Sequence, residues 1–162
     1  MKTTKHFEKN YLHGVAGVLV LTAIAKLFSL SSSEGVWSVN EPIFGLAYRP
    51  LFAILAGLEL VLAVCVLCRL PLQLKHSLIG LFAACGICYH AARAFAQIPE
   101  PCPCLGKLFE WSPWLERHGG MIALGILVFF AVMSLYFALL ATRSIPTNAD
   151  SSYVDAINPR PQ

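Results

Sequence analysis

The sequence is poor in charge. Asp, Glu, Lys and Arg together make up 13% of its 162 residues, whereas an ordinary soluble domain has roughly 25% charged residues. A small water-soluble protein needs a larger share of polar surface to cover its core. The low charge therefore excludes an ordinary soluble domain, and the surplus of apolar side chains must face lipid.

The chain also lacks a basic patch and any internal repeat. Its net charge of +3 comes from Lys and Arg side chains that are scattered along the sequence. Surfaces that bind nucleic acid concentrate such side chains in a patch or stripe. We therefore expect the lipid bilayer to be a partner, and we expect no nucleic acid to bind.

Apolar residues are abundant: 57% of the chain is hydrophobic, and the mean hydropathy is +0.65. A transmembrane helix needs about 20 predominantly apolar residues. Four stretches reach this length, from about Tyr11 to Leu30, Leu46 to Leu67, Leu74 to Phe95 and Met121 to Ala141. The sequence predicts an all-α fold, an integral membrane four-helix bundle with up-and-down connections.

Polar segments separate these helices and divide the chain. We expect a short N-terminus over 1–10, a four-helix transmembrane domain over 11–141 with loops at 31–45 and 97–120, and a disordered tail over 142–162. The first apolar stretch could instead be a cleaved signal peptide, with a small-x-small site at Ala23-Ile24-Ala25. Its apolar residues continue to Leu30, which favours a retained helix.

Lys and Arg near the helix ends predict the orientation, because cytoplasmic loops carry more of them. One side would hold six, namely Lys2, Lys5, Lys9, Arg69, Lys75 and Arg143, and the other four, namely Arg49, Arg93, Lys107 and Arg117. This bias predicts a multi-pass protein of the cell inner (plasma) membrane with both termini in the cytoplasm. The loops at 31–45 and 97–120 would then lie outside.

Six cysteines occur in three pairs, two of which lie in apolar helices. Cys65 and Cys68 fit the role of small apolar residues in packed helices. Cys85 and Cys88 fit it too, although they could also form a buried redox pair near the membrane midplane. A membrane quinone would then be the electron acceptor. We expect no other cofactor and no metal ion.

Cys102 and Cys104 flank Pro103 in the expected outer loop, where a free cysteine has no packing role. Proline fixes its own φ and restricts the preceding residue, so a bond between the two sulfurs would be strained. A strained disulfide is easily reduced. We interpret Cys102 and Cys104 as catalytic residues of thiol–disulfide exchange, although they could instead form structural disulfides.

Lys26 and Glu59 carry charge inside the first and second apolar stretches. Such charges are costly in lipid and usually face the bundle interior with a partner. We expect an internal polar pair, although Lys26 could instead extend to the interface while Glu59 is protonated. His90 and Arg93 could add to this polar cluster or extend to the interface themselves.

Small residues spaced four apart mark places where membrane helices approach closely. Two such pairs occur, Ala53 with Gly57 and Gly80 with Ala84. We expect close helix contacts at both.

The order of these features resembles the MauE family (methylamine utilisation), within the DoxX-like group of four-helix membrane proteins. The resemblance covers about Tyr11 to Ala141 and rests on Ala25-Lys26-Leu27, Leu58-Glu59-Leu60, Arg93 and Cys102-Pro103-Cys104-Leu105-Gly106. Leu105 stands where this family usually has an aromatic residue, and Pro103 stands where glycine is common.

The resemblance implies a role in maturing a periplasmic protein, such as a methylamine dehydrogenase subunit, through disulfide handling, processing or export. Cys102 and Cys104 would be its thiol pair and Lys26 and Glu59 its internal polar pair. An exported client or a thioredoxin-like protein would be the partner. The alternatives are a non-enzymatic membrane scaffold and a small-molecule binder or transporter that uses the Lys-Glu pair.

Overall fold

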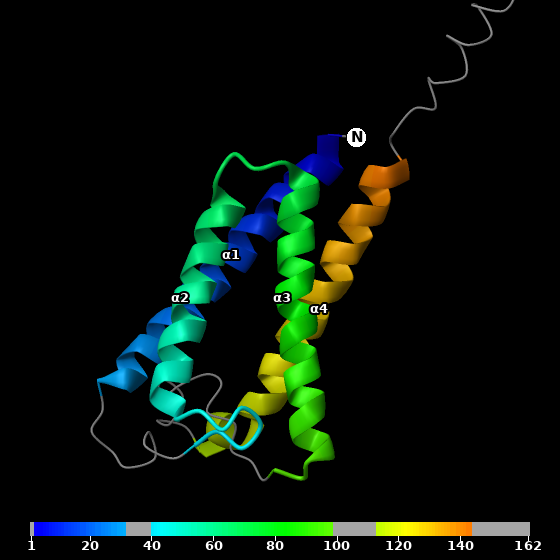
Figure 1. Ribbon diagram of the computed structural model, residues 1–162. Coiled ribbons are helices and arrows are strands. Elements are labelled where there is room, and N and C mark those ends of the chain that lie inside the picture. The colour runs from blue at the N-terminus through cyan, green and yellow to red at the C-terminus, as the bar shows by residue number, and fades with distance from the viewer. Residues whose placement is uncertain (1, 32–39, 99–112, 144–162) are drawn as a thin grey trace, which may run out of the picture.

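Four α-helices make up the structure, a computed structural model that describes residues 2–31, 40–98 and 113–143 (Figure 1). They are α1 (Lys2–Leu30), α2 (Tyr48–Leu67), α3 (Leu72–Phe95) and α4 (Pro113–Arg143). The described residues contain no β-strand beyond an isolated bridge between Asn40 and Ala47. The predicted all-α, up-and-down four-helix bundle is confirmed.

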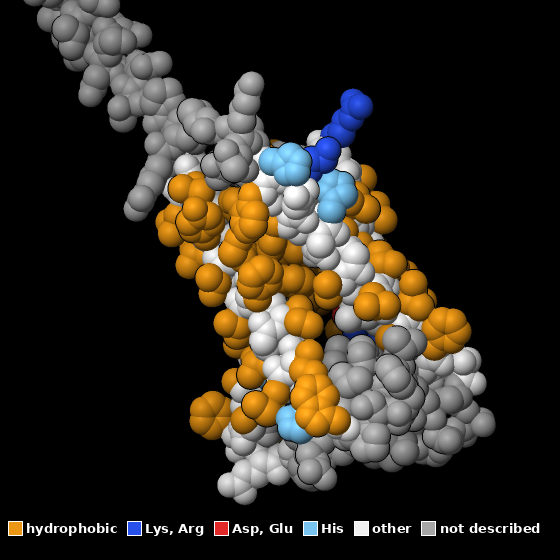
Figure 2. All heavy atoms as spheres, turned by 180° about the vertical axis from the view of Figure 1, so that it is seen from behind, with side chains coloured by type: hydrophobic (Ala, Val, Ile, Leu, Met, Phe, Trp, Pro, Cys, Tyr) orange, Lys and Arg blue, Asp and Glu red, His pale blue; other side chains and the backbone are white. Residues whose placement is uncertain are grey.

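Each helix contains a segment long and apolar enough to cross a membrane: His6–Leu30, Tyr48–Leu67, Leu72–Phe95 and His118–Ala141. The chain is therefore a multi-pass membrane protein. Large apolar side chains also cover the outer surface, as Figure 2 shows for one face. Leu81 and Leu135, for example, are 64% and 62% exposed, which suits contact with lipid.

Two helices extend well beyond their apolar spans. α1 begins at Lys2 rather than near Tyr11, and α4 begins at Pro113 rather than near Met121. Proline at a first helical position loses no hydrogen bond, because the first N–H groups of a helix have no intrahelical partner. The length of an apolar stretch predicts only the part of a helix that lies in lipid. It does not predict polar turns that extend the helix beyond the membrane.

Local backbone chemistry sets the other helix ends. Cys68–Pro71 joins α2 to α3, and Pro71 directly precedes the first residue of α3. At the end of α3, Gln97 takes a left-handed conformation with φ 51°. Its N–H donates to Ala94 O at 3.2 Å, while the Ile98 N–H donates to Arg93 O at 3.1 Å. This pair of bonds is a Schellman motif, which stops the helix.

The helices form two hairpins (Figure 1). α1 packs along α2 and α3 packs along α4, whereas α2 and α3 contact each other over a short stretch. Gly80 allows α3 to approach Ser134 of α4, because a Cβ at this position would lie 3.7 Å from the Ser134 Cβ. The close contact expected at Gly57 is absent: a Cβ there would meet nothing within 4 Å, and Ala53 is exposed.

The hydrophobic core lies in the half of the bundle that contains the N-terminus and the link between α2 and α3. Its residues come from all four helices: Tyr11, Leu12, Val15, Ala16, Leu19, Leu62, Ala63, Val66, Ile79, Ala83, Phe130 and Phe137. A polar contact crosses between the hairpins beside it, since His76 Nε2 lies 2.8 Å from Glu8 Oε1. The Tyr11 hydroxyl adds another, 3.2 Å from both Phe130 O and Ser134 Oγ. These contacts join the two hairpins at this end.

Candidate functional site

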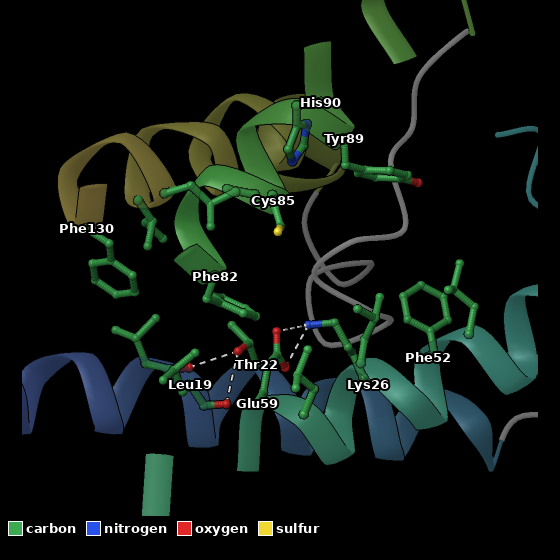
Figure 3. A pocket seen from close by; sticks show the side chains of 18 of the residues that line it. Leu19, Thr22, Lys26, Phe52, Glu59, Phe82, Cys85, Tyr89, His90 and Phe130 are labelled. Carbon is green, nitrogen blue, oxygen red and sulfur yellow. Dashed lines mark hydrogen bonds and ion pairs between the residues drawn. The ribbon is translucent and has the colours of Figure 1, made fainter. Parts of the chain in front are cut away.

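The other half of the bundle contains a cavity of about 290 Å³ between the two hairpins. Figure 3 shows α1 and α2 on one side of it and α3 and α4 on the other. On every helix the cavity residues continue from the core residues toward the opposite end of the bundle. Most lining side chains are apolar: Val18, Leu19, Phe44, Leu51, Phe52, Leu55, Leu58, Phe82, Ala123, Ile126, Leu127 and Phe130.

An ion pair lies in the wall of this cavity. Lys26 Nζ is 2.7 Å from Glu59 Oε1 and 2.9 Å from Glu59 Oε2, so the ammonium group bridges both carboxylate oxygens. Lys26 is 5% exposed and Glu59 is 6% exposed. The antiparallel α1 and α2 bring the two residues predicted as an internal polar pair into direct contact (Figure 3).

Burying this ion pair costs free energy that the stability of the bundle alone does not require. Removing two charges from water is expensive, and well-packed apolar residues of similar volume often stabilise a protein as much as a buried ion pair does. The pair also lies beside space that the described residues do not fill. The arrangement provides a compact polar group, with zero net charge, inside an otherwise apolar chamber.

The α3 wall of the cavity carries a thiol. Cys85 lines the cavity, and Figure 3 shows its sulfur and the Phe82 ring directed toward Lys26 and Glu59. The expectation that Cys85 and Cys88 pack against the other helices as small apolar residues is wrong, because both are exposed free thiols. The core-facing side of α3 bears Ile79 and Ala83 instead. Only Cys85 of the two lines the cavity. Their alternative role as a redox pair stays a prediction.

A buried carboxylate anchors the turn at the far end of the cavity. Glu41 is 0% exposed, and its Oε2 accepts hydrogen bonds from the backbone N–H groups of Ile43 and Phe44 at 2.8 Å. Its Oε1 accepts a bond from the Tyr89 hydroxyl at 3.1 Å. Arg93 Nη1 donates to the same hydroxyl at 3.4 Å. Arg93 itself is 6% exposed, so it is buried within the bundle rather than extended into solvent.

This anchored turn places an aromatic side chain at the cavity. Phe44 lines the cavity, and its ring stacks on Tyr89 with centroids 5.9 Å apart and planes 4° from parallel. His90 also lines the cavity, beside Tyr89 on α3. Of the accessory residues predicted on α3, Arg93 therefore holds the turn through Tyr89, and His90 lies in the cavity wall.

Sequence reasoning did not identify Glu41, Tyr89 or Phe44 as part of the site. A signal for Glu41 was present, because a carboxylate that precedes a turn with Pro42 and Gly45 can accept backbone N–H bonds. Gly45 takes φ +65°, as such a turn requires. Nothing in the sequence marked Tyr89 as the partner of Glu41.

Cys102 and Cys104 lie outside the described residues, so their expected role as catalytic thiols stays a prediction. The described residues on either side of them are Ile98, just after α3, and Pro113, at the start of α4. Both belong to the end of the bundle toward which the cavity extends. Among the described residues, no three His, Cys, Asp or Glu side chains lie together as a metal site.

No protein-family model matches the chain, and no curated protein and no solved structure is found to match it.

Proposed function

We propose that the bundle binds a lipid-soluble small molecule between its two hairpins. The observation that carries this proposal is the cavity of about 290 Å³, which is apolar except for one buried ion pair and a few polar neighbours. Small-molecule sites are concave and mostly apolar, with a few placed polar groups, and they occur between the helices of bundles. A ligand would account for a charged pair that packing alone does not require.

Two glycines offer a matched test. A Cβ at Gly86 would lie 2.7 Å from Leu127 Cδ1, and both residues line the cavity, so Gly86→Leu should fill it. A Cβ at Gly125 would meet nothing within 4 Å, so Gly125→Leu serves as the control. We expect Gly86→Leu to abolish ligand binding, while Gly125→Leu keeps it.

Binding can be read from the cysteines that the chain already has. Durene (tetramethylbenzene), a small apolar ring, should slow the alkylation of Cys85 by N-ethylmaleimide, because Cys85 lines the cavity. Cys88 is equally free and exposed but does not line it, so its rate should not change. Mass spectrometry of the two modified sites gives both rates. Equal rates with and without durene at Cys85 would contradict the proposal.

We propose a second function, membership of the MauE family and thiol–disulfide handling for an exported protein such as a methylamine dehydrogenase subunit. Its support is the resemblance in sequence, together with the position of Ile98 and Pro113, which flank the Cys102–Cys104 segment at the cavity end of the bundle. In this function a client thiolate attacks the Cys102–Cys104 disulfide to form a mixed disulfide, and a second client thiolate resolves it and leaves the client with a new disulfide. A membrane quinone then accepts the two electrons and two protons of the resulting Cys102 and Cys104 dithiol. The client or a thioredoxin-like protein would be the partner.

We propose that the protein lies in the inner (plasma) membrane with both termini in the cytoplasm, as the Lys and Arg bias favours. An impermeant thiol reagent, applied to intact cells after mild reduction, should label Cys102 or Cys104. Cys68 is exposed at the opposite end of the bundle, beside Arg69, and should be labelled only after lysis. Labelling of Cys68 alone in intact cells would reverse the orientation.

A further inference from the structure

We propose that the cavity selects a neutral, lipid-soluble quinone, whose ring lies among aromatic side chains and whose carbonyl oxygen accepts a hydrogen bond from Lys26. This inference rests on the proposed ligand-binding function and narrows the ligand to one chemical class. Three features carry it: the charge balance of the cavity, the hydrogen-bonding groups left over in its wall, and the character and outlet of the chamber.

Charge balance excludes ionic ligands. The Lys26 ammonium and the Glu59 carboxylate offset each other at 2.7 Å, so their part of the wall is neutral. A carboxylate or ammonium on the ligand would add a charge without a counter-ion in an apolar site, which is far more costly than burying a neutral polar group. The ligand is therefore uncharged.

The hydrogen-bonding groups of the cavity wall favour a ligand whose head group accepts a hydrogen bond. A lysine ammonium has three N–H donors, and the two contacts with Glu59 engage two of them. The nearby Thr22 hydroxyl lies 3.0 and 3.1 Å from the backbone oxygens of Val18 and Leu19 and also interacts with the Glu59 carboxylate. The remaining ammonium N–H can therefore donate to a carbonyl. Each carboxylate oxygen has a second lone pair, which can accept from the hydroxyl of a reduced quinol.

The chamber favours a planar ring. Six aromatic side chains line it: Phe44, Tyr48, Phe52, Phe82, Tyr89 and Phe130. Aromatic walls suit a flat ring in stacked or edge-on contact. Ligand pockets commonly span about 300–1,000 Å³, so a cavity of about 290 Å³ holds a ring-sized head and no long tail.

A tail would have to leave through the side of the bundle. Figure 2 shows a hollow among the apolar side chains of the rear face, with charged side-chain atoms visible at its base. This face belongs to the apolar surface that contacts lipid. The hollow gives a lipid-soluble molecule lateral access to the ion pair without passing through water, and an isoprenoid tail could remain in the bilayer.

Three ring-matched probes test the inference on the full-length protein in nanodiscs, with Cys85 alkylation as the readout and Cys88 as the internal control. Durene has the ring and four methyl groups, duroquinone adds two carbonyls, and tetramethylbenzoate adds a negative charge. The ring of duroquinone is fully substituted, so it cannot alkylate the thiol. We expect duroquinone to protect Cys85 at an at least about tenfold lower concentration than durene, because a hydrogen bond to a charged donor favours it.

The double change Lys26→Met and Glu59→Leu should make durene and duroquinone equally effective, because it removes the donor and leaves no charge unpaired. Comparable protection by durene and duroquinone in the unaltered protein would overturn the inference and leave the proposed ligand-binding function standing. Protection by tetramethylbenzoate as strong as that by duroquinone would also overturn it. If none of the probes protects Cys85, the proposed function and the inference fall together.

Discussion

Lys26→Met alone should destabilise the bundle by about 3–5 kcal/mol, because removing one partner of a buried ion pair leaves the other charge uncompensated. Glu59 is 6% exposed, and the Lys26 ammonium, 2.7 and 2.9 Å from its two oxygens, is its charged partner beside the Thr22 hydroxyl. Glu59→Leu alone should be costly for the same reason. Unfolding in mixed micelles of increasing sodium dodecyl sulfate, followed by circular dichroism, measures the change.

The double change Lys26→Met and Glu59→Leu should recover much of this loss, because neither charge then remains without a partner. Lys9→Met is a suitable control, since Lys9 is an exposed lysine on the same helix and should change stability little. Additive losses in the double-mutant cycle would show that the two side chains do not interact in the membrane.

Replacing only one of Cys102 and Cys104 should trap a covalent adduct. Exchange needs one thiolate to attack a disulfide and a second to resolve the product, so the single change Cys104→Ser or Cys102→Ser should leave a mixed disulfide with the client or a partner. Non-reducing gel electrophoresis should show a larger species that disappears with reductant. The double change should trap nothing, because no attacking thiol remains.

The free cysteines of the bundle supply the controls for this trapping experiment. Cys88→Ser should trap no adduct, because Cys88 is exposed on α3 and has no resolving role in the proposed exchange. A purely structural role for Cys102 and Cys104 predicts lower protein levels without any adduct. That outcome would remove the thiol-exchange proposal, while the fold would stand, because it depends on hydrophobic length.

The fold could be predicted because its physical cause is plain in the sequence. A span of apolar residues long enough for the bilayer can satisfy its backbone only as a helix, and four such spans joined by short or moderate loops give an up-and-down bundle. The contact of Lys26 with Glu59 was predictable for a related reason. Opposite charges on consecutive antiparallel helices have few other ways to avoid lipid.

The cavity could not be predicted, because it depends on how far apart the two hairpins lie. The residues that line the cavity are as apolar as those of the core, so the sequence does not separate the two groups. Phe82 and Leu127 of the cavity, for example, are as hydrophobic as Ile79 and Phe137 of the core. Helical periodicity also failed to show that Cys85 and Cys88 are exposed. In a membrane helix the lipid-facing and interior-facing sides are both apolar, so polarity cannot tell them apart.

The sideways hollow has a consequence for how selectivity is divided. A ligand that reaches the cavity from the bilayer is first concentrated by its own partition into lipid, and only then meets the ion pair of Lys26 and Glu59. Apolar transfer contributes about 0.8 kcal/mol for each buried CH₂ group, so a few methylenes on a tail multiply the local concentration many times. The membrane thus performs the first selection, for solubility, and the protein performs the second, for the head group. An association constant measured against the aqueous concentration of the ligand is therefore the product of its partition coefficient into lipid and its association constant within the membrane.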